Sequence, residues 1–394
     1  MSNPLSKRLI SLDVFRGLTI AGMIVVNDAG SWQHIYAPLG HASWHGVTPT
    51  DFVFPFFLFI VGVSIVLAYS RILKDNPPMG QLSRKIITRT AIIFGLGIFL
   101  SLWPHFNFAN IRLPGVLQRI ALVFLACSFI FLKTNWKTQA WIAGILLVGY
   151  WLAMALIPVP IDETISTAIA TGQVNSRHGM IDIGPLRQIS DNFIAANLEP
   201  GTNLEAWIDR LVLPFRIYQY TWDPEGVFST LPAIGTGLTG MLAGALLISK
   251  HKPEKKVIGL MIGGFLAMTF GNVWDWFFPF NKNLWTSSYV MYTSGLASMT
   301  LGFFYWYIDV LERDHYTYVF KVFGANAITA YVLHSGLGFL FRIEGFNINA
   351  AFMDGLTGIG LEPKFVSLLW ALAYTAFIFV PVWILYRRKI FIKI

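Results

Sequence analysis

The residues best suited to acid–base chemistry lie near the start of the chain, between positions 27 and 51. This segment holds three histidines, two aspartates and an asparagine in a sequence otherwise poor in such groups: Asn27, Asp28, His34, His41, His45 and Asp51. Histidine accepts and releases protons near neutral pH, so the cluster predicts general acid–base catalysis. The alternative interpretation is anchoring of histidine and tryptophan side chains at a membrane surface.

A metal site is a second alternative for the same segment. His41 and His45 are four residues apart, and Asp51 would supply a third ligand. Only a continuous helix would bring both histidines onto one face, and three residues that interrupt helices surround them: Gly40, Gly46 and Pro49. We therefore expect no metal.

Ionisable residues also stand inside segments that are otherwise apolar. Asp13 and Arg16 are three residues apart, so they pair on one helix face, either as a structural ion pair or toward a ligand. A guanidinium at Arg119 needs a carboxylate, a phosphate or a water-filled cavity. Asn326 and His334 are eight apart and share one face of a predicted helix, where hydrogen bonding between helices is the alternative role.

Two further polar groups precede apolar segments. Asp223 and Glu225 are two residues apart before a predicted helix, so they either hold a cationic substrate or are the acids that helix starts commonly carry. Lys282 is the only Lys or Arg in its loop, at a place where topology does not explain a positive charge. It is a candidate for binding a substrate, a neighbouring acid or a phosphate.

The elements that position these residues are membrane helices. Of 394 residues, 55% are apolar and 13% charged, against about 25% charged in soluble domains. This composition excludes a soluble fold of this size and a disordered chain, and a single cysteine excludes a disulfide scaffold. Ten segments have the length of a membrane helix: 9–26, 52–70, 90–111, 113–132, 138–160, 226–249, 257–274, 284–308, 322–341 and 365–386. We predict an all-α, polytopic bundle of about ten transmembrane helices.

Positive charge predicts the orientation of this bundle. With both termini in the cytoplasm, 19 Lys and Arg fall on the cytoplasmic side and 8 on the outer side. The net charge of +8 therefore reports topology, and no nucleic-acid partner is expected. Lys7 and Arg8 precede a first helix without a cleavage pattern, which predicts an uncleaved signal-anchor.

We expect the chain to form one domain, residues 1–394, with the outer segment 161–225 inside it. Residues 203–221 carry apolar side chains at helical spacing and predict one interfacial helix. A second outer segment, residues 30–50, contains the histidines.

Six motifs together resemble the transmembrane heparan-α-glucosaminide N-acetyltransferase family. They are 11–17 (SLDVFRG), 41–46 (HASWHG) with Thr48 and Asp51, 54–57 (FPFF), 113–119 (LPGVLQR), 223–226 (DPEG) and 281–288 (NKNLWTSS). The motifs run through most of the chain. They add four residues to the candidate substrate-binding and CoA-binding set: Trp44, Gln118, Trp285 and Ser287.

The resemblance implies a membrane enzyme that moves acetyl from cytosolic acetyl-CoA to the amine of a terminal glucosamine on the far side of the membrane. It implies that His41 is the catalytic histidine and that Asn27 lies in the active site. The chain begins at the first catalytic span, as in bacterial members, which implies a bacterial inner-membrane protein and leaves the natural acceptor open. A homodimer is also suggested.

Two mechanisms fit these expectations. In the direct route, His41 removes a proton from the sugar ammonium, Asp51 or Asp28 orients its ring, and Asn27 donates to the oxyanion. In the two-step route, His41 first takes the acetyl group itself. We favour the direct route because it needs no unstable intermediate. Arg119, Lys282 and Arg16 are the candidate cations for the CoA phosphates.

A different class of function competes with the enzyme. Asp13, Arg16, Arg119 and His334 would also serve a proton-coupled transporter of an amino sugar or acidic solute. The sequence has no clear inverted repeat, and its polar cluster lies at the outer end of the helices rather than at their middle, so we favour the enzyme. The number of buried charges argues against a scaffold subunit.

Overall fold

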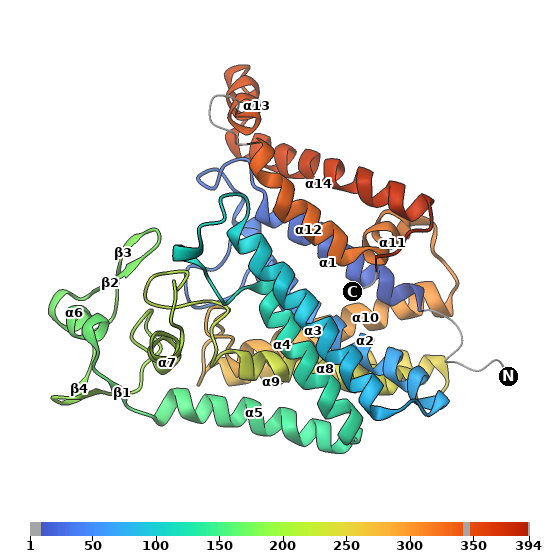
Figure 1. The fold of residues 1–394 in the computed structure, drawn as a ribbon, viewed down its shortest axis with the longest axis horizontal. Coiled ribbons are helices and arrows are strands. Elements are labelled where there is room, and N and C mark those ends of the chain that lie inside the picture. Colours follow the sequence, from blue (N-terminus) through green and yellow to red (C-terminus); the bar gives the residue numbers. More distant parts are fainter. Residues whose placement is uncertain (1–8, 342–346, 393–394) are drawn as a thin grey trace.

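A computed structural model describes residues 9–341 and 347–392 and shows a helix bundle with two small sheets at one end (Figure 1). This confirms the prediction of an all-α, multi-pass fold. Within the described ranges, eight helices are long and apolar enough to cross a membrane. They are α1 (Ile10–Asn27), α2 (Val53–Ile72), α3 (Met79–Leu102), α4 (Val116–Lys133), α5 (Trp136–Leu156), α8 (Thr230–Ile248), α9 (Pro253–Asp275) and α14 (Pro363–Arg387).

The other two predicted spans are also helical but differ from simple long helices. Segment 284–308 contains α10 (Ser287–Phe304), which continues as a π-helical turn over Tyr305–Val310. Segment 322–341 divides at Asn326 into α11 (Tyr318–Ala325) and α12 (Ala327–Leu337), followed by a 3-10 turn, Gly338–Phe341. An apolar window does not reveal such a break, because hydropathy reports composition and not backbone geometry.

The third span begins and ends earlier than predicted. The predicted apolar window, 90–111, starts directly after the charged residue Arg89. The helix α3 starts earlier, at Met79, and includes Arg84, Lys85 and Arg89. It ends at Leu102, two residues before Pro104, which has no backbone N–H to continue the helix.

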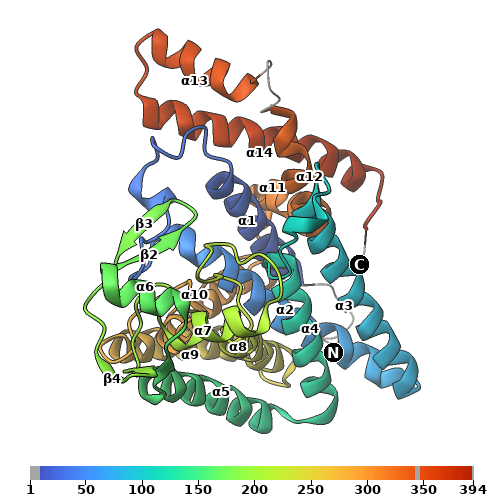
Figure 2. The same ribbon diagram turned by 60° about the vertical axis from the view of Figure 1, so that its left-hand side comes forward.

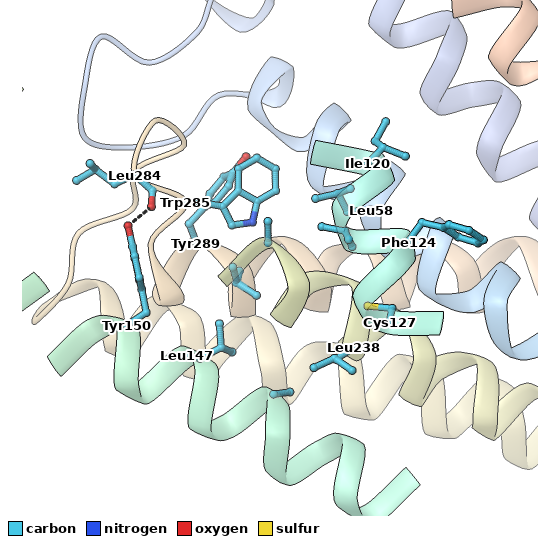
Figure 3. Packing of buried hydrophobic residues seen from close by; sticks show 14 of the residues in the cluster. Leu58, Ile120, Phe124, Cys127, Leu147, Tyr150, Leu238, Leu284, Trp285 and Tyr289 are labelled. Atoms are coloured by element: carbon cyan, nitrogen blue, oxygen red, sulfur yellow. Dashed lines mark hydrogen bonds between the residues drawn. The ribbon is translucent and has the colours of Figure 1, made fainter. Parts of the chain in front are cut away.

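Small residues let several helices approach closely. A Cβ on Gly324 of α11 would lie 1.8 Å from the carbonyl oxygen of Asp13 in α1, and one on Gly62 of α2 would lie 1.9 Å from that of Gly237 in α8. Membrane helices associate largely through such close packing, since lipid provides no hydrophobic drive between them. The largest core cluster fills the space among α2, α4, α5, α8 and α10 (Figure 3).

The outer segment 161–225 is mixed rather than one interfacial helix. It contains α6 (Glu163–Thr171) and α7 (Leu204–Val212) with a two-stranded sheet, β2 (Gln173–Ser176) and β3 (Gly179–Asp182). A second antiparallel sheet has the order β1 (Val159–Pro160), β5 (Phe193–Ile194), β4 (Gln188–Ser190). The predicted helix over 203–221 stops at Val212 because Pro214 follows.

Contacts at the described chain ends place them at one end of the bundle. The backbone N–H groups of Ile10 and Ser11 donate to the Asp309 carboxylate, and the Asn326 side chain bonds Ile390 and Ile392. The outer segment lies at the opposite end (Figure 1). This agrees with the predicted topology, although Lys7, Arg8 and Lys393, which contributed to the charge count, lie outside the described residues. The helix α13 (Ile348–Gly358) lies along α14 (Figure 2).

Candidate active site

The turn that opens α2 fixes the carboxylate of Asp51. Residues Pro49–Phe52 form a 3-10 turn closed by a capping box, in which Thr48 and Asp51 bond each other's backbone N–H groups. The Oδ2 atom of Asp51 accepts from the backbone N–H groups of Ala42 at 3.1 Å and Thr48 at 3.0 Å. Since the Asp51 side chain is only 1% exposed, these bonds hold a buried carboxylate in one orientation.

The other carboxylate oxygen of Asp51 contacts His41. Oδ1 lies 2.6 Å from Nδ1 of the imidazole, while the His41 side chain is 42% exposed. An ionised carboxylate can only accept, so Nδ1 carries the proton and Nε2 is left with its lone pair. This is the arrangement of an oriented general base. Of the two aspartates considered for this role, Asp51 contacts His41, whereas Asp28 contacts His334.

The geometry does not bring together the three residues of the metal alternative. Residues 40–48 are not helical, and the Nδ1 atom of His45 lies 3.4 Å from Nδ2 of Asn281 instead of facing Asp51. Within residues 9–341 and 347–392, no group of three or more His, Cys, Asp or Glu is placed to hold a metal ion.

Lys282 completes the contacts of His41 and Asp51. Its Nζ lies 3.1 and 3.2 Å from the two ring nitrogens of His41 and 3.8 Å from Oδ1 of Asp51. Burial lowers the pKa of Lys282, and Asp51 and Glu225 oppose that shift. The sequence singled out Lys282 for its unexplained charge, and the structure places it beside the histidine.

The loop that carries Lys282 is held by several internal hydrogen bonds. Asn281 is fully buried, receives a bond from the backbone N–H of Leu284 and donates its own N–H to Thr286 Oγ1. Trp285 has a positive φ of 51° and donates from Nε1 to Thr236 Oγ1 in α8. Figure 3 shows the Trp285 ring beside Tyr289, whose hydroxyl donates to the carbonyl oxygen of Asp51.

Three of the predicted binding residues make packing or hydrogen-bond contacts around the site. Trp285 and Ser287 are almost fully buried, and Ser287 donates to a carbonyl oxygen of α5. Trp44 donates from Nε1 to the carbonyl oxygen of Leu198 at 2.8 Å and packs edge-on against Trp222. Trp44 therefore ties the histidine loop to the outer segment.

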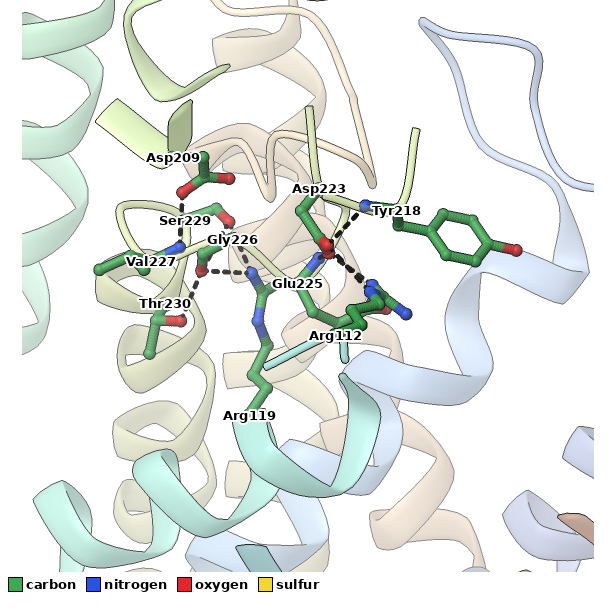
Figure 4. Close-up of polar contacts among 10 residues, drawn as sticks. All are labelled: Arg112, Arg119, Asp209, Tyr218, Asp223, Glu225, Gly226, Val227, Ser229 and Thr230. Carbon is green, nitrogen blue, oxygen red and sulfur yellow. Dashed lines mark hydrogen bonds and ion pairs between the residues drawn. The ribbon is translucent and has the colours of Figure 1, made fainter. Parts of the chain in front are cut away.

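A second polar cluster surrounds Asp223 and Glu225 (Figure 4). Arg112 donates to both carboxylates, and its guanidinium lies 4.4 Å from the Tyr218 ring centre. Burial opposes the charge of Glu225, but Arg112 and Arg119 outweigh it and hold the pKa of this carboxyl below its usual range. Arg112 was not predicted from the sequence. Like Lys282, it is a positive charge on the outer side, and this feature could have identified it.

Arg119 lies below this cluster and is buried. Its Nη2 donates to the Gly226 carbonyl and to Ser229 Oγ, and Trp285 lies 5.2 Å away (Figure 4). Ser229 occupies the N-cap position of α8, but its side chain makes no capping bond and instead accepts from Arg119. Gln118, the preceding residue, packs against Gly97 of α3.

Two acids close to Arg119 were not predicted from the sequence. Glu205 and Asp209, one turn apart on α7, are completely buried. Burial and mutual repulsion raise the pKa of Glu205 well above its usual range, and burial raises the pKa of Asp209 to about 7. Their i and i+4 spacing was visible in the sequence, but their inward orientation was not.

The remaining candidates lie elsewhere in the bundle. Asp13 and Arg16 pair at 3.3 Å as predicted and line a hollow of about 210 Å³ with Ser64 and Arg71. This hollow lies toward the end of the bundle that carries the chain termini.

Asn326 and His334 have separate partners. Asn326, at the helix break, bonds the C-terminal segment, and His334 lies 2.5 Å from Asp28. Asn27 is exposed at the end of α1, and no hydrogen bond joins it to His41 among the described residues.

Comparison with known proteins finds one group of similar enzymes. Residues 8–182 match the family model described as "Heparan-alpha-glucosaminide N-acetyltransferase, catalytic". Over 99% of its length, the chain is 29% identical to the human heparan-alpha-glucosaminide N-acetyltransferase and 27% identical to the mouse protein. The chain is therefore similar to heparan-alpha-glucosaminide N-acetyltransferases along nearly its whole length. It has the helices of a multi-pass membrane protein and spans about 60% of the length of these two relatives.

These matches confirm the resemblance found in the sequence. The matched region includes α1, the histidine loop and α4, so it contains His41, Asp51 and Arg119. Lys282, Asp223 and Glu225 lie beyond it, within the longer alignments to the two relatives.

Proposed function

We propose that this protein transfers the acetyl group of cytosolic acetyl-CoA to the amine of a glucosamine-type sugar on the extracytoplasmic side. The observation that carries the proposal is the His41–Asp51 pair, with Nδ1 bound at 2.6 Å and the ring 42% exposed. A sugar amine is largely an ammonium ion at neutral pH, and it attacks a thioester only after losing a proton. The oriented, accessible Nε2 of His41 is suited to take that proton.

The direct route needs the acetyl group at the outer end of the helix bundle and the nucleotide part of CoA at the cytoplasmic end. The hollow beside Arg16 and Arg71 supports an entry point for CoA, because guanidinium groups bind phosphate oxygens well. Eleven residues separate Arg16 from Asn27 along α1, which is about 16 Å of helix. The pantetheine arm would extend along this path toward His41, and Asn27 would donate to the reacting carbonyl from the end of α1.

The acceptor would enter from the outer segments. Asp223 and Glu225 are already bound to Arg112, so their contact with a sugar ammonium requires sharing with that guanidinium. Arg119 is buried beneath them and donates to the Gly226 carbonyl, so it supports the cluster.

Purified protein with labelled acetyl-CoA and glucosamine tests the proposal. We expect labelled N-acetylglucosamine from the native protein and a loss of at least 10²-fold in His41→Ala, since general bases typically contribute 10²–10⁴-fold. His34→Ala is the matched control, because His34 is an exposed histidine of the same loop, and it should retain native activity. Protein-bound acetyl that accumulates without acceptor would favour the two-step route. A protein that neither binds nor consumes acetyl-CoA would refute the proposal and leave solute uptake to be tested.

A further inference from the structure

The ammonium of Lys282 lies against the His41 ring in a way that leaves its protons available. Nζ is almost equidistant from Nδ1 and Nε2, at 3.1 and 3.2 Å. Nδ1 carries a proton directed at Asp51, and the in-plane lone pair of Nε2 points away on a different line, so one Nζ cannot lie in line with both nitrogens, and hydrogen bonds weaken steeply away from linearity. The contact is therefore a cation against a ring rather than a bond to one nitrogen.

The second partner of Lys282 also leaves donors free. Its separation of 3.8 Å from Asp51 Oδ1 is that of an ion pair and exceeds a hydrogen bond. A lysine ammonium carries three N–H donors. The Lys282 side chain is 21% exposed, so part of it faces the same space as the accessible face of His41. The turn held by Asn281 and Thr286 keeps the lysine there.

The reaction fixes where an oxyanion would form relative to Lys282. Once the first ammonium proton has passed from His41 to solvent, Nε2 takes a second N–H proton as the amine nitrogen forms its bond to the thioester carbon, and the carbonyl π electrons move to oxygen. The carbonyl then re-forms, the C–S bond breaks, and the proton on Nε2 passes to the departing thiolate. The carbonyl oxygen is one bond from the attacked carbon, so it lies close to Nε2 and within reach of Nζ.

We propose that Lys282 is a catalytic residue that donates an N–H bond to this developing oxyanion. This role rests on the proposed acetyl transfer. Fixed donors to an oxyanion act most strongly in a site with little water, and removal of one typically costs 10²–10³ in kcat. The burial that lowers the pKa of Lys282 is the same feature that strengthens such a contact.

A purely electrostatic influence of Lys282 on His41 predicts the opposite sign. Without the ammonium, proton uptake by the neighbouring ring becomes easier, because a like charge has been removed. Removal of an oxyanion donor slows the reaction instead. The direction of the change in kcat therefore separates the two roles.

The experiment compares the native protein with Lys282→Met and Lys282→Arg in acetyl transfer to glucosamine, together with binding of CoA. We expect Lys282→Met to lower kcat by 10²–10³ while KM for acetyl-CoA and CoA binding change little, and Lys282→Arg to recover part of the rate, since it keeps N–H donors. Thermal unfolding identifies a variant that fails to fold. If Lys282→Met fails to fold, Lys282→Arg provides the test, and we expect it to lower kcat while KM for acetyl-CoA changes little.

Two results would overturn this role. If the native protein transfers acetyl and Lys282→Met has an unchanged or higher kcat, the oxyanion contact is refuted while the acetyltransferase activity stands. Absence of transfer by the native protein would overturn both.

Discussion

Replacement of Asp51 by asparagine separates orientation of the base from stability of the turn. The amide has one oxygen and one NH2 where the carboxylate has two acceptors. If NH2 pointed at the backbone, the N–H groups of Ala42 and Thr48 would lose their acceptor, at about 1–3 kcal/mol each. We therefore expect NH2 to turn toward His41, whose Nδ1 must then accept and whose proton moves to Nε2.

That tautomer cannot act as a base. The expected loss in kcat/KM for Asp51→Asn is 10²–10⁴-fold, or about 3–5 kcal/mol. The loss in stability is smaller, about 1 kcal/mol, because a charge-assisted hydrogen bond becomes a neutral one. Thr50→Val is the matched control: it removes a buried hydroxyl of the same turn, which donates to the Pro38 carbonyl and does not contact His41.

Acetyl transfer and thermal unfolding in detergent, measured on both variants, provide the comparison. We expect Asp51→Asn to lose activity far beyond its loss of stability and Thr50→Val to lose some stability but little activity. The reasoning is refuted if Asp51→Asn keeps more than a tenth of native kcat/KM, or if Thr50→Val loses as much activity as Asp51→Asn does.

Three further predictions concern the outer clusters and the helix packing. Arg112→Lys should lower the free energy of unfolding by about 1–3 kcal/mol, because lysine cannot form the two-pronged contact with Asp223. Arg177→Lys, at the same tyrosine ring, should change it little, and equal losses would contradict this account. The pKa of Asp209, raised by burial to about 7, means that the folded state holds the proton more tightly, so stability should fall as pH rises from about 4 to about 7. The dependence of stability on pH should flatten in Asp209→Asn. Thermal unfolding measured across that pH range tests this, and an unchanged dependence in the variant would contradict it. Gly324→Ala should destabilise the bundle by about 1–3 kcal/mol through its contact with a carbonyl of α1, and a native melting temperature would exclude this close approach.

The sequence predicts the positions of the helices well because lipid imposes a simple rule. A span must be apolar and must satisfy its own backbone, so long apolar runs become helices. The rule fails where geometry matters more than composition. Asn326 divides an apolar run, and Pro104 ends α3 before its apolar run does.

The site was predictable by residue type but not by partner. His41, Asp51 and Lys282 stood out as rare polar groups in an apolar chain, and the structure brings all three together. The choice between Asp51 and Asp28 depended on the capping box, which fixes one carboxylate, and on His334, which contacts the other.

Arg112 and Glu205 were missed for a related reason. Arg112 contacts Asp223, which is more than a hundred residues away in the sequence. Glu205 is buried because it lies on the inward face of the short helix α7. Neither feature has a local pattern.

Sealed vesicles containing the purified protein provide the most direct test of transmembrane acetyl transfer through His41. In one preparation, labelled acetyl-CoA is outside the vesicles and glucosamine is inside. In the matched preparation, both substrates are outside. The account predicts labelled N-acetylglucosamine inside the vesicles when the substrates are on opposite sides, and none from vesicles with His41→Ala. Product that forms only when both substrates share one side, or that persists in His41→Ala, would contradict it.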